Sequence, residues 1–333
     1  MKPLGLGAIG SGEIAINSIF KHLILGDTAD KVYMAAVCDP VPGRAEAMAK
    51  EYGIKKWYMT DDELLADPDV DAVSICSPIR FHYEQGLKAI RAGKHVHFNK
   101  TMAMTSAEAT ELLEEAARMN VKMVGSDPGI CAELNGGTHM SFEDMAIMRN
   151  IPGMVVCEPV DSVQLRKLFG QIVDHEGPVY MRLFRKAPWK VFDESAEFTL
   201  GKACTLKKGR DATVFATGIM VKEALDAAET LAGEGVDVEV VNIHTLKPLD
   251  TQAVLESVAR TGCCVTAENA FAINGLGSAV AEAVCESTPV PVVRVGVEDE
   301  FGEVGPEDYL RKRFELTADK VYAKAKAAIA MKK

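Results

Sequence analysis

Residues 4–15 have the sequence LGLGAIGSGEIA, and this stretch decides the fold of the front of the chain. Its first half is an apolar run that predicts a buried strand, and its second half predicts the beginning of a helix. Gly10 allows a tight turn, Gly12 lets the backbone approach a pyrophosphate, and the small Ala15 permits close packing of helix against strand. The pattern predicts a dinucleotide site, with a ligand-free packing turn as the alternative.

An acidic residue further along the chain supports the nucleotide site. Asp39 follows the second predicted strand, residues 32–38. A carboxylate at the end of this strand can accept hydrogen bonds from the ribose hydroxyls of NAD, and it disfavours the extra phosphate of NADP. We therefore expect NAD as the cofactor, with NADP as the alternative.

Strand-like and helix-like patterns alternate along almost the whole chain. Residues 106–119 predict a clear helix, with Ser106 as its N-cap. The periodicity is lost over residues 186–208, which we interpret as a linker. Alternation of this kind predicts an α/β fold built on mostly parallel sheets with right-handed crossovers.

The composition indicates an acidic soluble protein. The chain has 333 residues, a formal net charge of −11 and a pI near 5.2. This negative charge repels phosphate backbones, so nucleic acid and anionic membranes are not expected partners. No apolar run approaches the roughly 20 residues that span a bilayer. The eight cysteines form no CxxC pair, which favours reduced thiols in a cytoplasmic protein.

Several segments of the front half share a family pattern. They read VSICSP at residues 73–78, AGKHV at 92–96 and NKT at 99–101. In this order and spacing, residues 3–125 resemble the glucose-fructose oxidoreductase / inositol dehydrogenase family (Gfo/Idh/MocA). The resemblance implies a Rossmann-type parallel sheet and adds Ser77 and Pro78 to the cofactor-binding residues.

The same resemblance implies a catalytic role for Lys100. In the family, the lysine of a Glu-Lys-Pro segment reaches the active site near the nicotinamide; here Asn99 and Thr101 depart from that form. A surface lysine at a strand end is the alternative. No later segment resembles the substrate domain in which that family keeps most of its proton-transfer groups.

From about residue 121 the chain resembles a different family. The first group of motifs is NGGTH at 135–139, RNIPGM at 149–154 and GPVYMRLFR at 177–185. The second group is HTLKPLD at 244–250, EN at 268–269, GLGS at 275–278 and FGE at 301–303. These groups are similar to the pyrimidine-binding and C-terminal domains of split transketolases. The resemblance implies a partial transketolase pyrimidine-domain segment followed by a transketolase C-terminal α/β domain.

The transketolase resemblance also implies roles toward a sugar or sugar phosphate. His139 matches a histidine that contacts the sugar, and it is the second catalytic candidate. Asn135 stands where an aspartate often recognises a substrate hydroxyl, and its amide can still form hydrogen bonds. Arg185 matches an arginine that grips the substrate phosphate with its forked donors. A capping histidine and a surface arginine are the alternatives.

The resemblance is incomplete where thiamine chemistry is concerned. The family's glutamate, which acts on the aminopyrimidine, lies in a Gly-Ile-Ala-Glu-Gln type segment one half-domain before the Thr-His motif. Here the Rossmann unit replaces that half-domain, and no other segment supplies the motif. We therefore expect thiamine diphosphate with Mg²⁺ only where a partner, a transketolase N-terminal subunit, completes the site. We predict no metal site within this chain.

We expect three parts: a Rossmann domain over 1–124, a partial pyrimidine-binding segment over 125–192 and a transketolase C-terminal domain over 193–333. The seam between the first two, NVKMVGSDPG at 120–129, fits either family. A half-domain without its neighbouring strands has unpaired edges. The segment 130–185 is therefore expected to dock onto the Rossmann sheet, to find a partner chain or to stay loose.

Three functions remain open at this point. The chain is a transketolase-like C-terminal subunit fused to a Rossmann domain, an NAD-dependent oxidoreductase acting on a sugar or polyol, or a non-catalytic NAD-binding dimer. The transketolase part and the oxidoreductase part each lack about half of the elements that catalysis needs. The third function, a non-catalytic NAD-binding dimer, therefore requires the fewest assumptions. We expect a homodimer because transketolase-type active sites lie between subunits.

Overall fold

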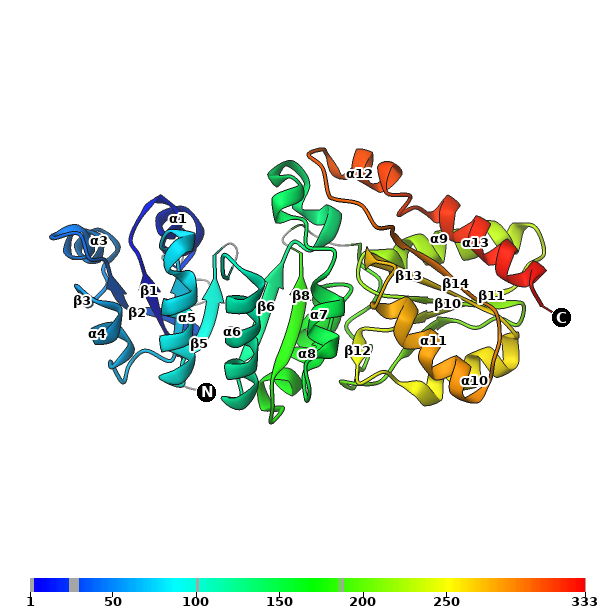
Figure 1. Cartoon of the computed structure of the whole chain (residues 1–333), viewed down its shortest axis with the longest axis horizontal. Coiled ribbons are helices and arrows are strands. Elements are labelled where there is room, and N and C mark those ends of the chain that lie inside the picture. The colour runs from blue at the N-terminus through cyan, green and yellow to red at the C-terminus, as the bar shows by residue number, and fades with distance from the viewer. Residues whose placement is uncertain (1–2, 24–29, 100–101, 185, 187–188, 333) are drawn as a thin grey trace. The chain divides into compact units, whose positions relative to one another are not determined.

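The structure is a computed structural model that describes residues 3–23, 30–99, 102–184, 186 and 189–332. The chain divides into two compact units, whose elements are labelled in Figure 1. The front unit comprises Met1–Met123 and Glu176–Pro178, and the rear unit comprises Val124–His175 and Val179–Lys333.

The front unit is built on one five-stranded parallel sheet. Its strands are β1 (Leu4–Ile9), β2 (Val32–Cys38), β3 (Lys56–Tyr58), β4 (Ala72–Ile75) and β5 (His95–Phe98). They lie in the order β3-β2-β1-β4-β5. The order reverses between β1 and β4, which is the arrangement of a doubly wound nucleotide-binding sheet.

Helices of the front unit contribute to two separate apolar clusters. One cluster contains Ala8 and Val37 with residues of α1 (Glu13–Ala15), a π-helical turn (Ile16–Phe20) and α3 (Arg44–Tyr52). The other contains Ile9 and Ala36 with residues of α4 (Asp61–Leu65), α5 (His82–Arg91) and α6 (Ser106–Arg118). Neighbouring strand residues thus face opposite sides of the sheet. The helix predicted after the glycine turn is present as α1, the π-helical turn and α2 (Lys21–Leu23).

The N-cap of α6 differs from the prediction. Thr105, and not Ser106, holds this position: its side chain accepts a hydrogen bond from the Glu108 N–H, and the Glu108 carboxylate reaches back to the Thr105 N–H. This reciprocal pair is a capping box. Ser106 is wrong as the cap because it already lies in the first turn of the helix.

The C-terminal part of the rear unit contains a five-stranded sheet. Its order is β14 (Val292–Val297), β13 (Cys264–Phe271), β10 (Ala212–Ala216), β11 (Val238–Asn242) and β9 (Cys204–Lys207). Only β9, at one edge, runs antiparallel among these described strands. Figure 1 shows α9 (Met220–Gly233) and α13 (Ala318–Ala330) on one face, and α10 (Thr251–Thr261) and α11 (Leu276–Ser287) on the other.

The predicted pyrimidine-domain segment contributes strands to a second sheet, most of which belongs to the rear unit. The order is β12 (Thr245–Lys247), β7 (Val155–Cys157), β8 (Val179–Leu183) and β6 (Lys122–Ser126), accompanied by α7 (Asp144–Asn150) and α8 (Ser162–Asp174). The short strand β12 comes from the C-terminal part and pairs antiparallel with β7. Within the rear unit, β12 supplies the backbone partner that the edge of β7 requires.

The predicted linker is folded against the rear unit. The N–H groups of Val191 and Phe192 both donate to Asp161 Oδ2, at 2.9 and 2.8 Å. Phe192 is buried and meets Phe198 edge to face, with ring centroids 4.6 Å apart. These residues therefore form a packed strap, although it contains no helix or strand among its described residues before β9.

Candidate functional site

The glycine turn of the front unit lies at the carboxyl ends of β1 and β4. Gly10 has a φ of 91°, and a Cβ atom at this position would lie 3.0 Å from the backbone N of Ser77. Only glycine fits this approach without strain. The turn therefore brings Gly10 and Ser77 together at the point where the strand order reverses, where ligands bind in such sheets.

The second glycine of the motif has space in front of it. Gly12 precedes α1 in an extended conformation, and a Cβ atom there would meet nothing within 4 Å. Ala15 is fully buried and packs with Ala8 and Val37. The backbone at Gly12 is thus accessible to a phosphate group, while Ala15 keeps the turn close to the sheet.

Asp39 connects β2 to the glycine turn. Its Oδ2 accepts hydrogen bonds from the Ser11 N–H at 3.0 Å and the Ser11 hydroxyl at 2.9 Å, and its Oδ1 accepts one from the Val41 N–H at 3.0 Å. Burial of the carboxyl raises its pKa, but these hydrogen bonds and the charge of Arg44 outweigh burial and hold the pKa of Asp39 below its ordinary value. The carboxylate is therefore ionised at neutral pH and retains lone pairs for a further donor.

The predicted catalytic and phosphate-binding residues are placed only in part. Lys100 and Arg185 lie outside the described residues. Pro78 follows β4 and precedes a short 3₁₀ helix, Ile79–Phe81. Ser77 donates its hydroxyl to Gln85 Oε1 at 2.5 Å, which ties the end of β4 to α5.

Asn135 and His139 lie on the same loop of the rear unit. Both are exposed, and they end two short 3₁₀ segments, Gly129–Asn135 and Gly137–His139. The His139 ring shares a hydrogen bond with the Thr138 hydroxyl, at 3.0 Å between Nδ1 and Oγ1. A Cβ atom on Gly137 would lie 2.1 Å from the Gly302 carbonyl oxygen, so the loop rests directly on the FGE motif. The two motifs, which are far apart in the sequence, are thus in direct contact.

A buried ionic cluster joins the two sheets of the rear unit, and sequence reasoning missed it. Arg182 is fully buried on β8 and donates to Asp144 on α7 at 2.7 and 2.9 Å and to Glu158 at 2.9 Å. Glu158 also accepts from the Thr217 hydroxyl at 2.9 Å. Burial raises the pKa of Glu158, and Arg182 opposes that rise. The arginine thus holds two carboxylates that would be costly to bury alone.

The Glu268–Asn269 motif adds further hydrogen bonds beside the buried cluster of Arg182. Glu268 accepts hydrogen bonds from the N–H groups of Leu276 and Gly277, at 2.7 and 2.8 Å, at the beginning of α11. Burial raises the pKa of Glu268 to about 7, although these two donors oppose the rise. Asn269 donates to the Pro128 carbonyl at 3.0 Å and accepts from the Ile130 N–H at 3.1 Å. Both motif residues are structural in this geometry.

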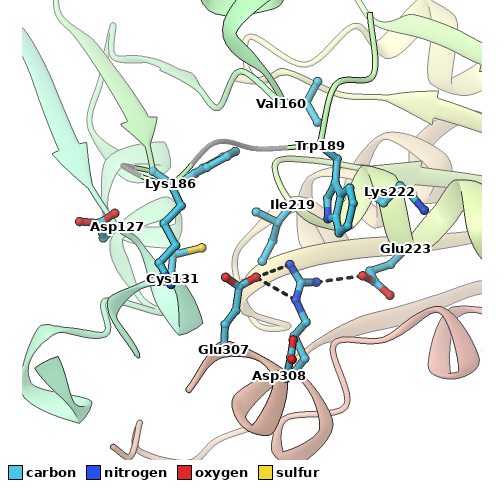
Figure 2. Close-up of a pocket in the computed structure, with 12 residues that line it drawn as sticks. Asp127, Cys131, Val160, Lys186, Trp189, Ile219, Lys222, Glu223, Glu307 and Asp308 are labelled. Atoms are coloured by element: carbon cyan, nitrogen blue, oxygen red, sulfur yellow. Dashed lines mark hydrogen bonds and ion pairs between the residues drawn. The ribbon is translucent and has the colours of Figure 1, made fainter. Parts of the chain in front are cut away.

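A cavity of about 360 Å³ opens at the carboxyl ends of strands from both rear sheets (Figure 2). Asp127 directly follows β6, Phe184 directly follows β8, and Ile219 lies shortly after β10. Trp189, from the strap, stands at the same cavity as Arg311 from α12 (Glu307–Arg313). Sequence reasoning missed this cavity because its lining comes from five separate segments.

Two further properties concern ions and membranes. The described residues contain no group of three or more His, Cys, Asp or Glu side chains that could hold a metal ion. No helix in the described part of the chain has the length and apolar character needed to cross a membrane.

Three family models match the chain. Residues 4–126 match the oxidoreductase family, NAD-binding Rossmann fold. Residues 97–188 match the transketolase pyrimidine binding domain, and residues 201–321 match the transketolase C-terminal domain. The first two models overlap over residues 97–126, so α6 and β6 fit both families.

Individual proteins of transketolase type also match the chain. The chain is 63% identical over 205 residues to the 6-deoxy-6-sulfo-D-fructose transketolase subunit SqwH of Clostridium sp. (strain MSTE9), a match that covers 62% of this chain and 64% of that protein. It is 35% identical over 235 residues to a putative transketolase C-terminal section of Methanocaldococcus jannaschii, covering 69% and 73% of the two chains. A solved split gene transketolase, described as an inactive beta4 tetramer, matches with a TM-score of 0.69 and 31% identity over 94% of this chain and 97% of that one.

Fold and motifs thus define a two-part α/β protein, with a nucleotide-binding part in front and a transketolase-type part behind. The chain belongs to the transketolase family, as a relative of the C-terminal section of split transketolases that carries a Gfo/Idh/MocA-type Rossmann domain at its front.

Proposed function

We propose that this chain is an NAD-binding protein of transketolase descent that does not transfer a ketol group by itself. The observation that carries this proposal is the arrangement of Gly10, Asp39 and Ser77 at the carboxyl ends of neighbouring parallel strands. A pyrophosphate would meet the backbone at Gly12, where no side chain stands in the way. The front unit therefore has the parts that a dinucleotide requires.

The charge of Asp39 favours NAD over NADP. Its hydrogen bonds with Ser11 and Val41 keep the carboxylate ionised and fixed at the end of β2. Ribose hydroxyls can donate to its remaining lone pairs, whereas the 2′-phosphate of NADP would be repelled. Bound NAD would supply a hydride acceptor. Lys100 is the residue of this chain that we expect to move a proton beside it if oxidation occurs.

The transketolase part lacks residues that thiamine chemistry needs. The sequence contains no segment of the Gly-Ile-Ala-Glu-Gln type, so no residue of this kind is available to activate the aminopyrimidine. His139 and Asn135 remain exposed on one loop, where they would face a sugar only after another subunit supplied the cofactor. We therefore infer that ketol transfer, and with it thiamine diphosphate and Mg²⁺, requires a transketolase N-terminal subunit as partner.

A second function is favoured by the 63% identity to a subunit whose name specifies 6-deoxy-6-sulfo-D-fructose. With a partner subunit, this chain would then serve ketol transfer from an anionic sugar, with Arg185 holding the sulfonate or phosphate. The guanidinium fork suits either anion. We place this function second because the residues that the Rossmann unit replaces include the activating glutamate.

The test measures binding and turnover on the same purified protein. Calorimetry should give a single NAD site with affinity at least about tenfold higher than that for NADP, a difference of about 1.4 kcal/mol. Ketol transfer and NAD reduction with sugars or polyols should both be undetectable for the chain alone. NAD reduction abolished by Lys100→Met would establish the oxidoreductase instead. Ketol transfer on adding a transketolase N-terminal subunit, abolished by His139→Ala, would establish the second function.

A further inference from the structure

The cavity of the rear unit shown in Figure 2 occupies the position of a ligand site. In α/β proteins, ligands bind outside the carboxyl ends of the strands, and this cavity opens beyond the ends of β6, β7, β8 and β10 through Asp127, Val160, Phe184 and Ile219. Its volume of about 360 Å³ lies within the range of about 300–1,000 Å³ that is usual for small-molecule sites.

The charges around the cavity argue against an anionic ligand. The lining contains three basic residues, and each is already paired with a carboxylate. Lys186 pairs with Glu133, and Lys222 pairs with Asp226. Arg311 donates to Glu307 and Glu223 at distances of 2.6 to 2.9 Å. Asp308, also in the lining, has no ion-pair partner among the described residues. An incoming phosphate or sulfonate would lie beside these carboxylates and be repelled by them.

The contact between the Trp189 ring and Lys222 argues against a cationic ligand. Trp189 is 60% exposed, and the Lys222 ammonium lies 5.4 Å from its ring centroid. The Lys222 ammonium thus already makes the cation–π contact with Trp189 that a cationic ligand would otherwise make. A second cation at the ring would be repelled by Lys222 and by the half-buried Arg311. The Trp189 ring is therefore better suited to contact an uncharged ligand.

Covalent capture by the cavity is also disfavoured. Cys131 is the lining nucleophile, and burial raises the pKa of its thiol to about 12. The thiolate is the reactive form of cysteine, so this side chain stays protonated and inert at neutral pH. The ligand must therefore be held by stacking and hydrogen bonds.

We propose that this cavity binds a neutral polyhydroxylated ring, such as a free pyranose, stacked on Trp189 and hydrogen-bonded to Glu307, Asp308 and Arg311. The C–H face of such a ring is apolar and matches the indole, while its hydroxyls match groups at the rim. Carboxylates accept from hydroxyls. Arg311 uses three of its five N–H groups for its carboxylates, so the other two can donate to sugar oxygens. This site is independent of nucleotide binding in the front unit.

Calorimetry with D-glucose, D-glucose 6-phosphate and choline tests the proposal on the full chain. D-glucose should bind saturably, D-glucose 6-phosphate at least about tenfold more weakly, and choline should not bind. Trp189→Leu should weaken D-glucose binding by up to about tenfold, which corresponds to the usual worth of an aromatic contact. The matched control is Trp57→Leu, which replaces the chain's other tryptophan on β3 of the front unit and should leave D-glucose binding unchanged.

A second measurement does not depend on the folding of the Trp189 variant. In Trp57→Phe protein, Trp189 is the sole tryptophan, and its emission should change saturably with D-glucose. Absence of saturable D-glucose binding, tighter binding of D-glucose 6-phosphate, or saturable binding of choline would each overturn the proposal. The affinity for NAD should be the same in all three variants, so failure here is distinguishable from failure of the nucleotide site.

Discussion

The two units of this chain use their polar residues in opposite ways. In the front unit, the turn around Gly10 and the carboxylate of Asp39 lie at strand ends, where ligands bind in sheets of this kind. In the rear unit, Arg182 is instead buried with Asp144 and Glu158 between two sheets. We propose the first arrangement as a binding site, whereas the second stabilises the fold.

The rear unit shows how residues of a family motif can support the fold. Glu268 and Asn269 belong to a motif typical of the transketolase C-terminal domain, yet here their hydrogen bonds hold α11 and the segment at Pro128 in place. Their geometry supports the fold whether or not a thiamine site is formed. The front unit, by contrast, has kept a glycine turn at which we propose that a dinucleotide binds.

The largest expected effect is the loss of the buried arginine. Arg182→Met leaves Asp144 and Glu158 buried without their cation, which should cost the rear unit about 3–5 kcal/mol. Tryptophan fluorescence during urea unfolding shows which unit is destabilised, because Trp57 lies in the front unit and Trp189 in the rear unit. The Trp189 transition should move to lower urea while the Trp57 transition stays in place.

The control for this substitution is Arg166→Met. Arg166 pairs with Glu194 on the surface, where both side chains are more than half exposed, and such pairs contribute little. We expect a change below about 0.5 kcal/mol. Equal shifts of both tryptophan transitions in Arg182→Met would contradict the separation of the two units.

The next effect is a pH dependence in the rear unit. Burial raises the pKa of Glu268 from 4.5 to about 7, so the folded state binds more protons than the unfolded state between these values. The stabilisation is complete below about pH 4.5 and is lost as the pH rises through about 7. Relative to Glu268→Gln, the wild-type protein should lose up to about 3 kcal/mol over this interval.

Stability curves of both proteins from pH 4.5 to 8 check this expectation. The glutamine also loses one acceptor for the Leu276 and Gly277 N–H groups, but that loss is constant with pH. Glu229→Gln, on the exposed face of α9, is the matched control, and its stability should depend on pH in the same way as that of the wild-type protein. A wild-type stability that rises relative to Glu268→Gln with pH would show that the two backbone donors dominate over burial.

A smaller effect is expected at the glycine turn of the front unit. Gly10→Ala places a Cβ atom at a φ of 91° and 3.0 Å from the Ser77 N, with a strain of about 1–3 kcal/mol. The dissociation constant for NAD should rise at least about tenfold. Gly53→Ala is the control: its φ of 67° is also positive, but nothing lies within 4 Å of the added carbon. Unchanged NAD affinity in Gly10→Ala would remove the turn from the binding site.

The smallest effect concerns α6, the helix that matches both families. Thr105→Ala removes the capping box with Glu108 and should cost about 1 kcal/mol, measured on the Trp57 transition. Ser106→Ala, one residue along, should cost less than about 0.5 kcal/mol. A larger loss of stability in Ser106→Ala than in Thr105→Ala would show that Ser106 is the cap. A shift of the Trp189 transition alone would assign α6 to the rear unit.

The sequence predicted features that depend on residues close together in the chain. The turn at Gly10 and the carboxylate of Asp39 were recognisable because each follows a strand within one βαβ unit. The cluster around Arg182 was not, because its partners lie 38, 24 and 87 residues away. The pairing of β12 with β7 escaped prediction for the same reason. β3 and α4 were missed because strands and helices of a few residues show no periodicity.

The most direct test of the central claim is thermal unfolding, followed by Trp57 and Trp189, with NAD or with thiamine diphosphate and Mg²⁺. NAD at about 100 times its dissociation constant adds about 2.7 kcal/mol of stability, which should raise the Trp57 midpoint by several degrees. We expect no change at Trp189 and no effect of thiamine diphosphate with Mg²⁺. Stabilisation by thiamine diphosphate with Mg²⁺, and none by NAD, would contradict the assignment of cofactor binding to the front unit.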